Sequence, residues 1–228
     1  VQTPQGFRYP EILAAHKAAA GMNLTDDAAI AEKAGFDVVM LEGVEGNTKI
    51  TRAEDLDMIG LARAAQWEYR TGQGFDVHRF EPGDKVQLCG VSIDHDKALA
   101  GHSDADVGLH ALTDAILGAA AAGDIGEHFP PTDPQWRGAN SSIFLRYAAK
   151  LITDMDAKIV NVDVTLICEA PKVAPHRAKM RALLADLLNL EVDRVGIKAT
   201  TTEKLGFTGR REGIAAQALA TIRVRAEE

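Results

Sequence analysis

The chain has 228 residues and a formal net charge of −8 at pH 7, so it lacks the basic excess of proteins that bind nucleic acids. No apolar run approaches the roughly 20 residues that span a bilayer, and no charged n-region precedes an apolar h-region, so the sequence predicts neither a membrane span nor a signal peptide. Cys89 and Cys168 have neither metal-site nor redox spacing. We therefore expect reduced, buried thiols in a cytoplasmic protein whose partner is a small molecule.

The first predicted element is a helix over 53–65, which gives way to Gln66-Trp-Glu-Tyr-Arg70 before a strand. We place a boundary between two domains here, with one domain over residues 1–66 and the other over 67–228. A chain of this length is long enough for one full core and a partial one.

After this boundary, segments of strand and helix periodicity follow one another. Alternating apolar residues predict strands, and apolar residues at helical spacing predict amphipathic helices. The predicted strands cover 71–79, 86–91, 160–168, 194–200 and 217–225, and the predicted helices cover 103–122, 139–154 and 176–189. This order indicates an α/β (α+β) fold in which a mixed sheet carries helices on one face.

The segment Gly74-Phe-Asp-Val-His78 places Asp76 and His78 two residues apart on a predicted strand. Side chains at i and i+2 of a strand project from the same face, so the strand can present both to one ion. His110, in the next predicted helix, can supply a third ligand. Two imidazoles and one carboxylate suit a Zn²⁺ ion with an open fourth position, the arrangement of catalytic zinc. The spacing alone does not establish that the three residues converge.

The predicted helix over 103–122 has a polar face. Ser103 can cap its N-terminus, and Asp106, His110 and Asp114 recur every four residues. A neighbouring carboxylate can therefore orient His110 for a metal. The alternative is an ordinary solvated stripe.

Two further polar features flank this helix. His102-Ser103 precedes it and can contact an anion through backbone N–H groups, the hydroxyl and the imidazole, or can act simply as a cap. The loop Gly123-Asp-Ile-Gly-Glu-His-Phe-Pro-Pro-Thr-Asp-Pro134 follows it and is rich in glycine and proline. Asp124 in this loop can accept hydrogen bonds from a sugar diol, although capping or turn formation explains it as well.

A polar cluster follows the predicted strand over 194–200, within Lys198-Ala-Thr-Thr-Thr-Glu-Lys-Leu-Gly-Phe-Thr-Gly-Arg210. Open α/β sheets build their sites at strand ends. The three threonine hydroxyls and free backbone N–H groups can hold phosphate oxygens, and Glu203 offers a hard oxygen ligand suited to Mg²⁺. The alternative is a Thr-rich, solvated strand end.

Five segments from about residue 70 to residue 225 resemble, in order, the family of 2-C-methyl-D-erythritol 2,4-cyclodiphosphate synthase, an enzyme of the non-mevalonate isoprenoid pathway. Chance does not reasonably explain five matches in register. The segments are Gly74-Phe-Asp-Val-His78, His102-Ser-Asp-Ala-Asp-Val-Gly-Leu-His110, Gly123-Asp-Ile-Gly126, Ala170-Pro-Lys172 with Pro175-His176, and Lys198 to Arg210.

The resemblance implies a phosphorus–oxygen lyase. In its reaction the 2-phosphate of 4-diphosphocytidyl-2-C-methyl-D-erythritol 2-phosphate attacks the β-phosphorus and expels CMP, without consuming water. The family's ligand sets imply Zn²⁺ on Asp76, His78 and His110. They also imply Mg²⁺ or Mn²⁺ on Glu203 and the substrate phosphates. The catalytic residues implied as transition-state stabilisers are His102 and Thr201.

The same resemblance implies the contacts with the substrate. Asp124 and Gly126 would contact the ribose, and the loop from Ala170 to His176 would surround the cytosine. Phe207 and Arg210 match positions near a central channel of the family's homotrimer, whose active sites lie between neighbouring subunits. The implied substrate-binding residues are Ser103, Asp124, Ile125, Gly126, Phe129, Thr132, Asp133, Ala170, Pro171, Lys172, His176, Thr200, Thr202, Phe207 and Arg210.

The first seventy residues resemble the C-terminal part of methylerythritol phosphate cytidylyltransferase, a nucleotidyltransferase with an α/β fold. The matching segments include Thr3-Pro-Gln-Gly-Phe-Arg8, Leu24-Thr-Asp-Asp27 and the stretch from Gly46 to Leu56. Arg8 and Lys49 would position the methylerythritol phosphate. The glycine-rich loop that holds CTP in that family does not occur in this sequence. We therefore expect a cyclase with a transferase remnant, as in a bifunctional enzyme, and transferase activity only with the missing part.

Two other classes of function stay open. A zinc phosphohydrolase would use an open metal position to activate water and would cut the diphosphate without ring closure. A non-catalytic scaffold would use the metal only to brace its assembly, so Asp76→Ala would abolish assembly first. The hydrolase leaves the match to the cytosine loop unexplained, and the scaffold gives Thr201, Glu203 and His102 no purpose.

Overall fold

The structure, a computed structural model, describes residues 5–43, 49–50, 52, 55 and 67–226. The chain divides into two compact units, Val1–Ala64 and Ala65–Glu228, and each is described by itself. Nearly all of the predicted helix over 53–65, and Gln66 at the predicted domain boundary, lie outside the described residues. Among the helices that are described, none has the length and apolarity needed to cross a membrane.

The described part of the N-terminal unit contains two short helices, α1 (Tyr9–Ala18) and α2 (Asp27–Lys33). Asp26 caps α2, because its Oδ1 accepts the Ala29 N–H at 2.9 Å. Gln5 Nε2 donates to the other oxygen of the same carboxylate at 3.3 Å. Neither helix is among the predicted elements, since both segments are short and alanine-rich and carry few large apolar side chains.

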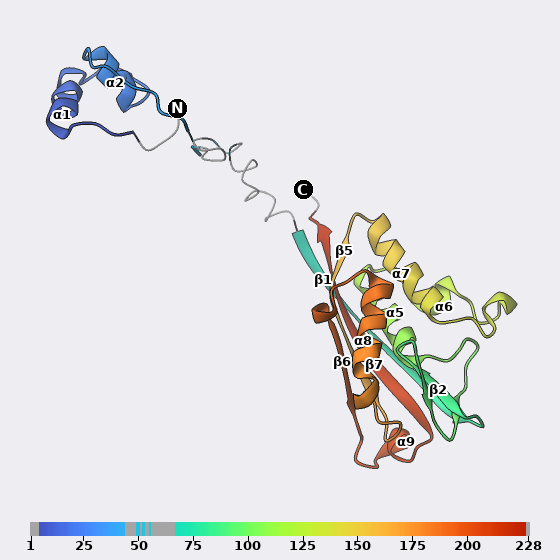
Figure 1. Cartoon of the computed structure of the whole chain (residues 1–228). Helices are drawn as coiled ribbons and strands as arrows, with labels where there is room; N and C mark the ends of the chain where they lie inside the picture. The colour runs from blue at the N-terminus through green and yellow to red at the C-terminus, as the bar shows by residue number, and fades with distance from the viewer. Residues whose placement is uncertain (1–4, 44–48, 51, 53–54, 56–66, 227–228) are drawn as a thin grey trace. The chain divides into compact units, whose positions relative to one another are not determined.

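The larger unit is built on a five-stranded sheet in the order β4-β1-β7-β5-β6 (Figure 1). Only β5 and β6 pair in parallel and the other neighbours are antiparallel, so the sheet is mixed, as predicted. Two more strands, β2 (Lys85–Leu88) and β3 (Val91–Asp94), form a separate hairpin. The strands of the large sheet are β1 (Trp67–Glu81), β4 (Ala98–Leu99), β5 (Lys158–Ile167), β6 (Val195–Thr200) and β7 (Gly213–Arg225).

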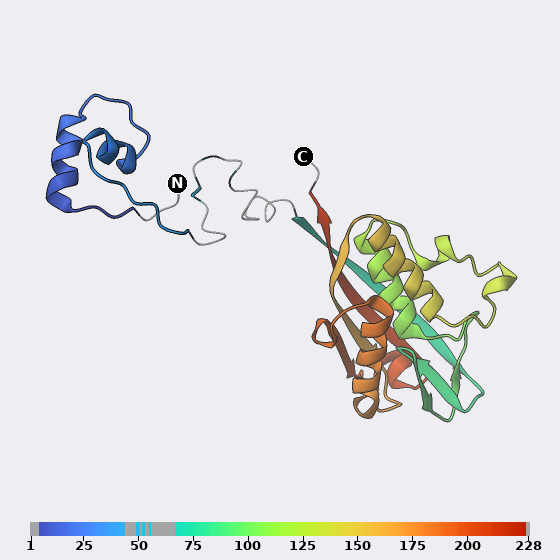
Figure 2. The same cartoon turned by 45° about the horizontal axis from the view of Figure 1, so that its top comes forward.

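Three long helices lie on one face of this sheet (Figure 2). They are α5 (Val107–Ala119), α7 (Ser142–Asp154) and α8 (Arg177–Leu188). The short helices α6 (Ile125–His128) and α9 (Gly206–Gly209) and 3₁₀ turns at Pro134–Trp136, Ala174–His176 and Val192–Arg194 lie in the connections. The predicted α/β fold is confirmed, and most predicted elements differ from the observed ones only at their ends.

The core lies between the helices and the sheet. Along β7, the residues that face the helices are buried and alternate with more exposed residues such as Gln217 and Leu219. Helix α5 lies very close to β1, where Gly72 and Gly74 leave room for it. A Cβ at Gly74 would lie 1.9 Å from the Ala111 carbonyl oxygen, so only glycine permits this approach.

The predicted strand over 86–91 is wrong, because the chain turns at Cys89 and Gly90 and forms two strands there. Both residues have positive φ angles, 50° and 79°, as a tight two-residue hairpin of type I′ requires. Their N–H groups donate to the two carboxylate oxygens of Asp106 at 2.8 and 2.6 Å. A cysteine with positive φ is uncommon, and the apolar residues on both sides read as one strand.

The predicted helix over 103–122 starts later than expected, at Val107. Asp106 caps it in place of Ser103, since its Oδ1 accepts the N–H groups of the second and third helical residues at 3.1 and 3.0 Å. Asp106 is only 1% exposed, and burial raises its pKa although its backbone partners act in the opposite direction. The alternative of an ordinary solvated stripe is therefore wrong for Asp106. Asp106 instead connects the β2–β3 hairpin to the start of α5.

Candidate active site

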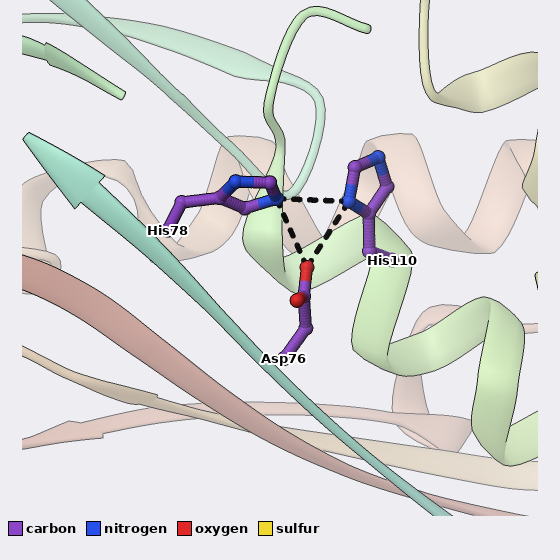
Figure 3. Close-up of side chains that lie close together, drawn as sticks. All are labelled: Asp76, His78 and His110. Carbon is purple, nitrogen blue, oxygen red and sulfur yellow. Dashed lines mark hydrogen bonds and ion pairs between the residues drawn. The ribbon is translucent and has the colours of Figure 1, made fainter. Parts of the chain in front are cut away.

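The residues Asp76, His78 and His110 converge at one point beside the sheet (Figure 3). Asp76 and His78 project from the helix-covered face of β1, and His110 projects from the first turn of α5. Asp76 Oδ2 lies 3.0 Å from His78 Nε2 and 3.0 Å from His110 Nδ1, and the two nitrogens are also 3.0 Å apart. Ligands of a tetrahedral zinc ion at about 2.0–2.1 Å lie roughly 3.3 Å apart, so the triad fits such an ion closely.

Each ligand side chain is fixed by a second hydrogen bond. His78 Nδ1 contacts the Ala100 carbonyl oxygen at 2.6 Å, so Nδ1 donates and Nε2 is left for a metal. Asp76 Oδ1 accepts the Val77 N–H at 2.8 Å, which leaves Oδ2 facing the imidazoles. His110 Nε2 contacts hydroxyl groups on the side away from the triad.

The three groups also interact electrostatically. Burial alone would raise the pKa of Asp76, but the adjacent imidazoles of His110 and His78 hold that pKa well below its usual range. Burial acts to lower the pKa of His78, but the bond and charge of Asp76 outweigh burial and raise that pKa. The half-buried triad therefore offers an ionised carboxylate to a cation.

The predicted phosphate and metal segment forms a tight turn after β6. Glu203 has a φ angle of 52° and is exposed, and Thr201 Oγ1 donates to its Oε1 at 2.6 Å. The hydroxyl of Thr202 turns inward and donates to the Leu205 carbonyl at 2.6 Å. Thr200 Oγ1 donates to the Thr201 carbonyl at 3.1 Å. The exposed Glu203 carboxylate is thus free to meet a divalent ion, whereas Thr202 is occupied with the turn.

Glu169 connects this turn to the predicted cytosine loop. Its Oε1 accepts the Thr202 N–H at 3.3 Å and the Lys204 N–H at 3.2 Å. Glu169 directly precedes Ala170 and the cis peptide bond to Pro171. The two predicted binding segments are therefore held side by side at the ends of β5 and β6.

The rest of the predicted cytosine loop exposes backbone and a cation. Lys172 is exposed, Pro171 is half-buried, and the buried Val173 anchors the loop to the core. His176 is half-buried and precedes α8. Farther along the chain, Phe207 is 37% exposed.

The predicted sugar-contact loop is shaped by helix caps. Asp124 Oδ1 accepts the Glu127 N–H at 3.0 Å and caps α6, which is the alternative left open by the sequence. Ile125 N–H donates to Asp114 at 2.8 Å. Gly126 and Asp124 are both exposed.

The same loop continues into an aromatic cluster. The ring of Phe129 lies 5.0 Å from that of Trp136 and 4.6 Å from that of Phe144. Asp133 accepts the Gln135 N–H at 3.0 Å and caps the following 3₁₀ turn, while Thr132 is exposed. Phe129 and Asp133 therefore have structural roles that shape the loop.

Two of the remaining predicted residues, Arg210 and Arg8, form ion pairs. Arg210 Nε donates to Glu212 at 2.8 Å. In the N-terminal unit, Arg8 lies 3.6 Å from Glu11, and Lys49 is exposed and helps to lower the pKa of Asp26, after the bonds from Ala29 and Gln5.

The triad and Thr200, the last residue of β6, lie at the same end of the sheet, but other strands separate them within one chain. Strand pairing aligns Val77 with Ala215, Ala215 with Ile167 and Ile167 with Thr200. Three strand spacings separate the two ends of this row, which is about 14 Å. Directly paired residues share a face, so Thr200 projects from the face opposite to Asp76.

Three polar residues near the site are missing from the predicted set: Asp104, Ser141 and Glu169. Ser141 lies inside the predicted helix over 139–154, where a single serine carries no signal of a site. Its observed side-chain partners are instead His110, Ser103 and Asp104. Local sequence cannot reveal partners that lie 31 to 38 residues apart.

The fold and the triad together define an α/β protein with a candidate metal centre at the end of a mixed sheet. The chain belongs to the YgbB family, whose sequence profile matches residues 69–223. A second profile, 2-C-methyl-D-erythritol 4-phosphate cytidylyltransferase, matches residues 1–64. These matches confirm both resemblances predicted from the sequence.

The chain is similar to curated proteins described as bifunctional enzyme IspD/IspF. It is 60% identical over 222 residues to the protein of Paramagnetospirillum magneticum, covering 97% of this chain and 58% of the relative. It is 59% identical over 221 residues to that of Rhodospirillum rubrum, with the same coverage of 97% and 58%. The chain thus spans a little over half the length of these relatives.

Solved structures show the same relationship. The bifunctional IspDF of Campylobacter jejuni is 38% identical with a TM-score of 0.67, covering 98% of this chain and 60% of that one. IspF of Plasmodium falciparum, in complex with CDP, is 34% identical with a TM-score of 0.61, covering 70% of this chain and 97% of that one. A 2C-methyl-D-erythritol-2,4-cyclodiphosphate synthase is 42% identical with a TM-score of 0.61, covering 66% and 98%.

Proposed function

We propose that the part over residues 67–228 cyclises 4-diphosphocytidyl-2-C-methyl-D-erythritol 2-phosphate to 2-C-methyl-D-erythritol 2,4-cyclodiphosphate, with release of CMP, in the non-mevalonate isoprenoid pathway. The convergence of Asp76, His78 and His110 within a chain of this family carries the proposal. An oxygen of the 2-phosphate bonds to the β-phosphorus. The bond from that phosphorus to the bridging oxygen breaks, and CMP leaves with the oxygen and its electron pair.

The chemistry asks the protein to hold phosphates in line and to meet negative charge, and it needs no protein nucleophile. The triad would hold Zn²⁺, and the Glu203 carboxylate would hold Mg²⁺ or Mn²⁺. Bound there, these ions would neutralise charge that develops on the phosphate oxygens. Thr201 keeps the Glu203 carboxylate in place through its 2.6 Å hydrogen bond. His102 is exposed at the loop before α5, where its imidazole could donate to a phosphate oxygen.

The cytidine part of the substrate would be held by exposed loop groups. Asp124 and Gly126 would contact the ribose, and the loop from Ala170 to His176 would surround the base, with Lys172 available to a phosphate. The complex of the similar Plasmodium falciparum protein with CDP supports a cytidine nucleotide as ligand. The other contacts proposed are those of Ser103, Ile125, Phe129, Thr132, Asp133, Pro171, Thr200, Thr202, Phe207 and Arg210.

A homotrimer with active sites between neighbouring subunits fits two features of the larger unit. Thr200 lies three strand spacings, about 14 Å, from the strand that carries Asp76 and projects from the opposite face of the sheet, so a neighbouring copy would complete the site. The sheet face away from the helices also exposes large apolar side chains. They are Tyr69, Phe75, Val77 and Leu219, with exposed fractions of 63, 56, 39 and 43%. Such a patch on a soluble protein marks an interaction surface.

We expect the protein in solution to have about three times the 24.4 kDa mass of one chain. Phe75→Asp would place a charge on the proposed interface and would reduce the mass to that of one chain, because burying an unpaired carboxylate is costly. Met155→Asp, at a position that is 43% exposed after α7, is the matched control and should stay trimeric. Light scattering measures all three, and a trimeric Phe75→Asp variant would exclude this face.

The proposed boundary between the two parts is at residues 66 and 67. The whole protein would also carry CTP-dependent methylerythritol phosphate cytidylyltransferase activity, in which Arg8 and Lys49 would position the methylerythritol phosphate. This activity would need residues that the chain does not contain. Cys89 and Cys168 are free and buried, which is compatible with the proposed cytoplasmic location.

The test of the cyclase is ³¹P NMR of the protein with its substrate, Zn²⁺ and Mg²⁺. CMP together with a cyclic diphosphate is the expected result. CMP with only linear phosphates would indicate a phosphohydrolase, and an unchanged spectrum from metal-loaded protein would favour the scaffold.

Glu203→Gln is expected to weaken the binding of Mg²⁺ without loss of zinc, because the neutral amide is a poorer ligand for a hard cation. The half-saturating Mg²⁺ concentration should rise roughly 10-fold, equal to about 1.4 kcal/mol. Initial rates over a Mg²⁺ titration at fixed Zn²⁺ measure the change. Glu191→Gln, which alters another exposed carboxylate, is the control. An unchanged titration would remove Glu203 from the ligand set.

A further inference from the structure

A chain of hydrogen bonds extends from His110 on the side of its imidazole that faces away from the triad. His110 Nε2 lies 2.9 Å from Ser141 Oγ and 3.0 Å from Ser103 Oγ. Ser141 Oγ donates to Asp104 Oδ1, and the Ser141 N–H donates to Asp104 Oδ2 at 3.2 Å. Ser141 is fully buried, with an exposed fraction of 0%. Ser103 and Asp104 lie in the loop before α5, and Ser141 directly precedes α7.

The direction of these bonds follows from counting protons. Ser141 Oγ donates to Asp104 Oδ1, so its single hydroxyl proton is committed to Asp104. The oxygen of Ser141 can then only accept from its other neighbours. Ser103 Oγ lies 3.2 Å from Ser141 Oγ and accepts the Ala105 N–H at 3.2 Å, so Ser103 can donate its own proton to Ser141. The 2.9 Å contact between His110 Nε2 and Ser141 Oγ is therefore a hydrogen bond when Nε2 carries a proton.

A proton on Nε2 leaves Nδ1 of a neutral imidazole without a proton. In a neutral imidazole with its proton on Nε2, Nδ1 carries a lone pair. His110 Nδ1 is the atom that lies 3.0 Å from Asp76 Oδ2 and from His78 Nε2. The hydroxyl network thus favours the one tautomer of His110 that can bind a metal together with Asp76 and His78.

We propose that Ser141 and Asp104 are positioning residues that select the tautomer and orientation of His110 and thereby set the metal affinity of the triad. This rests on the proposed metal role of the triad. The same network fixes the loop that carries His102, since the Asp104 N–H donates to the Ala139 carbonyl at 3.0 Å. Asp104 therefore stabilises both the orientation of His110, through Ser141, and the loop that carries His102.

The test uses Ser141→Ala and Zn²⁺ alone as the probe, with affinity measured by competition against a chromogenic chelator. Second-sphere partners of ligating histidines are worth about 10- to 100-fold in metal affinity, and we expect a loss in this range. Asp104→Asn should lose less, because an amide oxygen can still accept from Ser141. The control is Thr113→Val, which removes a buried hydroxyl one turn along α5 whose bond goes to the Leu109 carbonyl.

A second readout separates positioning from a merely structural role. In ¹⁵N NMR spectra of metal-free protein, wild-type His110 should carry a proton on Nε2. Ser141→Ala should lose part of this Nε2 protonation with unchanged circular dichroism, because Asp76, 3.0 Å from Nδ1, then favours the proton on Nδ1. Wild-type Zn²⁺ affinity and an unchanged tautomer in Ser141→Ala would overturn the proposal. If wild-type protein binds no Zn²⁺, the metal role of the triad fails, and the tautomer spectra then decide the positioning role by themselves.

Discussion

We expect His110→Ala to abolish the proposed Zn²⁺ binding and to lower the rate of CMP release roughly 1000-fold, equal to about 4 kcal/mol of transition-state stabilisation. The imidazole contributes one of three proposed ligand atoms that lie 3.0 Å apart, so its loss would leave two ligands and an incomplete site. Zinc content after dialysis and initial rates measure the two effects. The fold should persist, with a change in melting temperature of only a few degrees, because no secondary-structure bond depends on this side chain.

His16→Ala is the matched control for this variant. His16 is a histidine of the N-terminal unit that lies 3.0 Å from Asp27, and its side chain is 46% exposed. Its removal should change neither zinc content nor rate. A His110→Ala protein that keeps its zinc and full activity would remove His110 from the ligand set and would refute the proposed centre.

Gly74→Val is expected to prevent folding of the larger unit. A Cβ at this position would lie 1.9 Å from the Ala111 carbonyl oxygen and 2.8 Å from the Ala115 nitrogen, both of them backbone atoms of α5. The helix would have to move away from β1, which opens the core, and a cost above about 5 kcal/mol is comparable with the whole stability of a domain. Far-UV circular dichroism and thermal unfolding measure the loss.

Gln73→Val makes the same substitution one residue earlier, on the exposed face of the strand. Its melting temperature should stay within a few degrees of the wild-type value, because a β-branched residue suits a strand. If Gly74→Val unfolds at the same temperature as Gln73→Val, the close approach of α5 to β1 is not required. Gly74 would then have no part in aligning Asp76, two residues farther on, with His110.

The sequence predicted those features of the candidate site that depend only on residues close together in the chain. The spacing of Asp76 and His78 needs only the two-residue period of a strand to bring both side chains to one face. The order of strands and helices likewise indicated a mixed sheet with helices on one face, since each element carries its own apolar period. The sequence also offered His110 as a third ligand, and the family segments implied the same ligand set, although the spacing alone did not establish that the three residues converge.

Only the tertiary structure decided which distant groups meet. The close contact of α5 with Gly72 and Gly74 brings His110 to the strand, and the polar pattern of α5 alone was also compatible with a solvated stripe. The pattern misplaced Asp106, because hydrogen bonds to a separate hairpin, rather than its position relative to His110, determine where it lies. Local periodicity describes one element at a time, whereas the partners of Ser141 and the separation of Thr200 from the triad depend on how loops and strands pair across the fold.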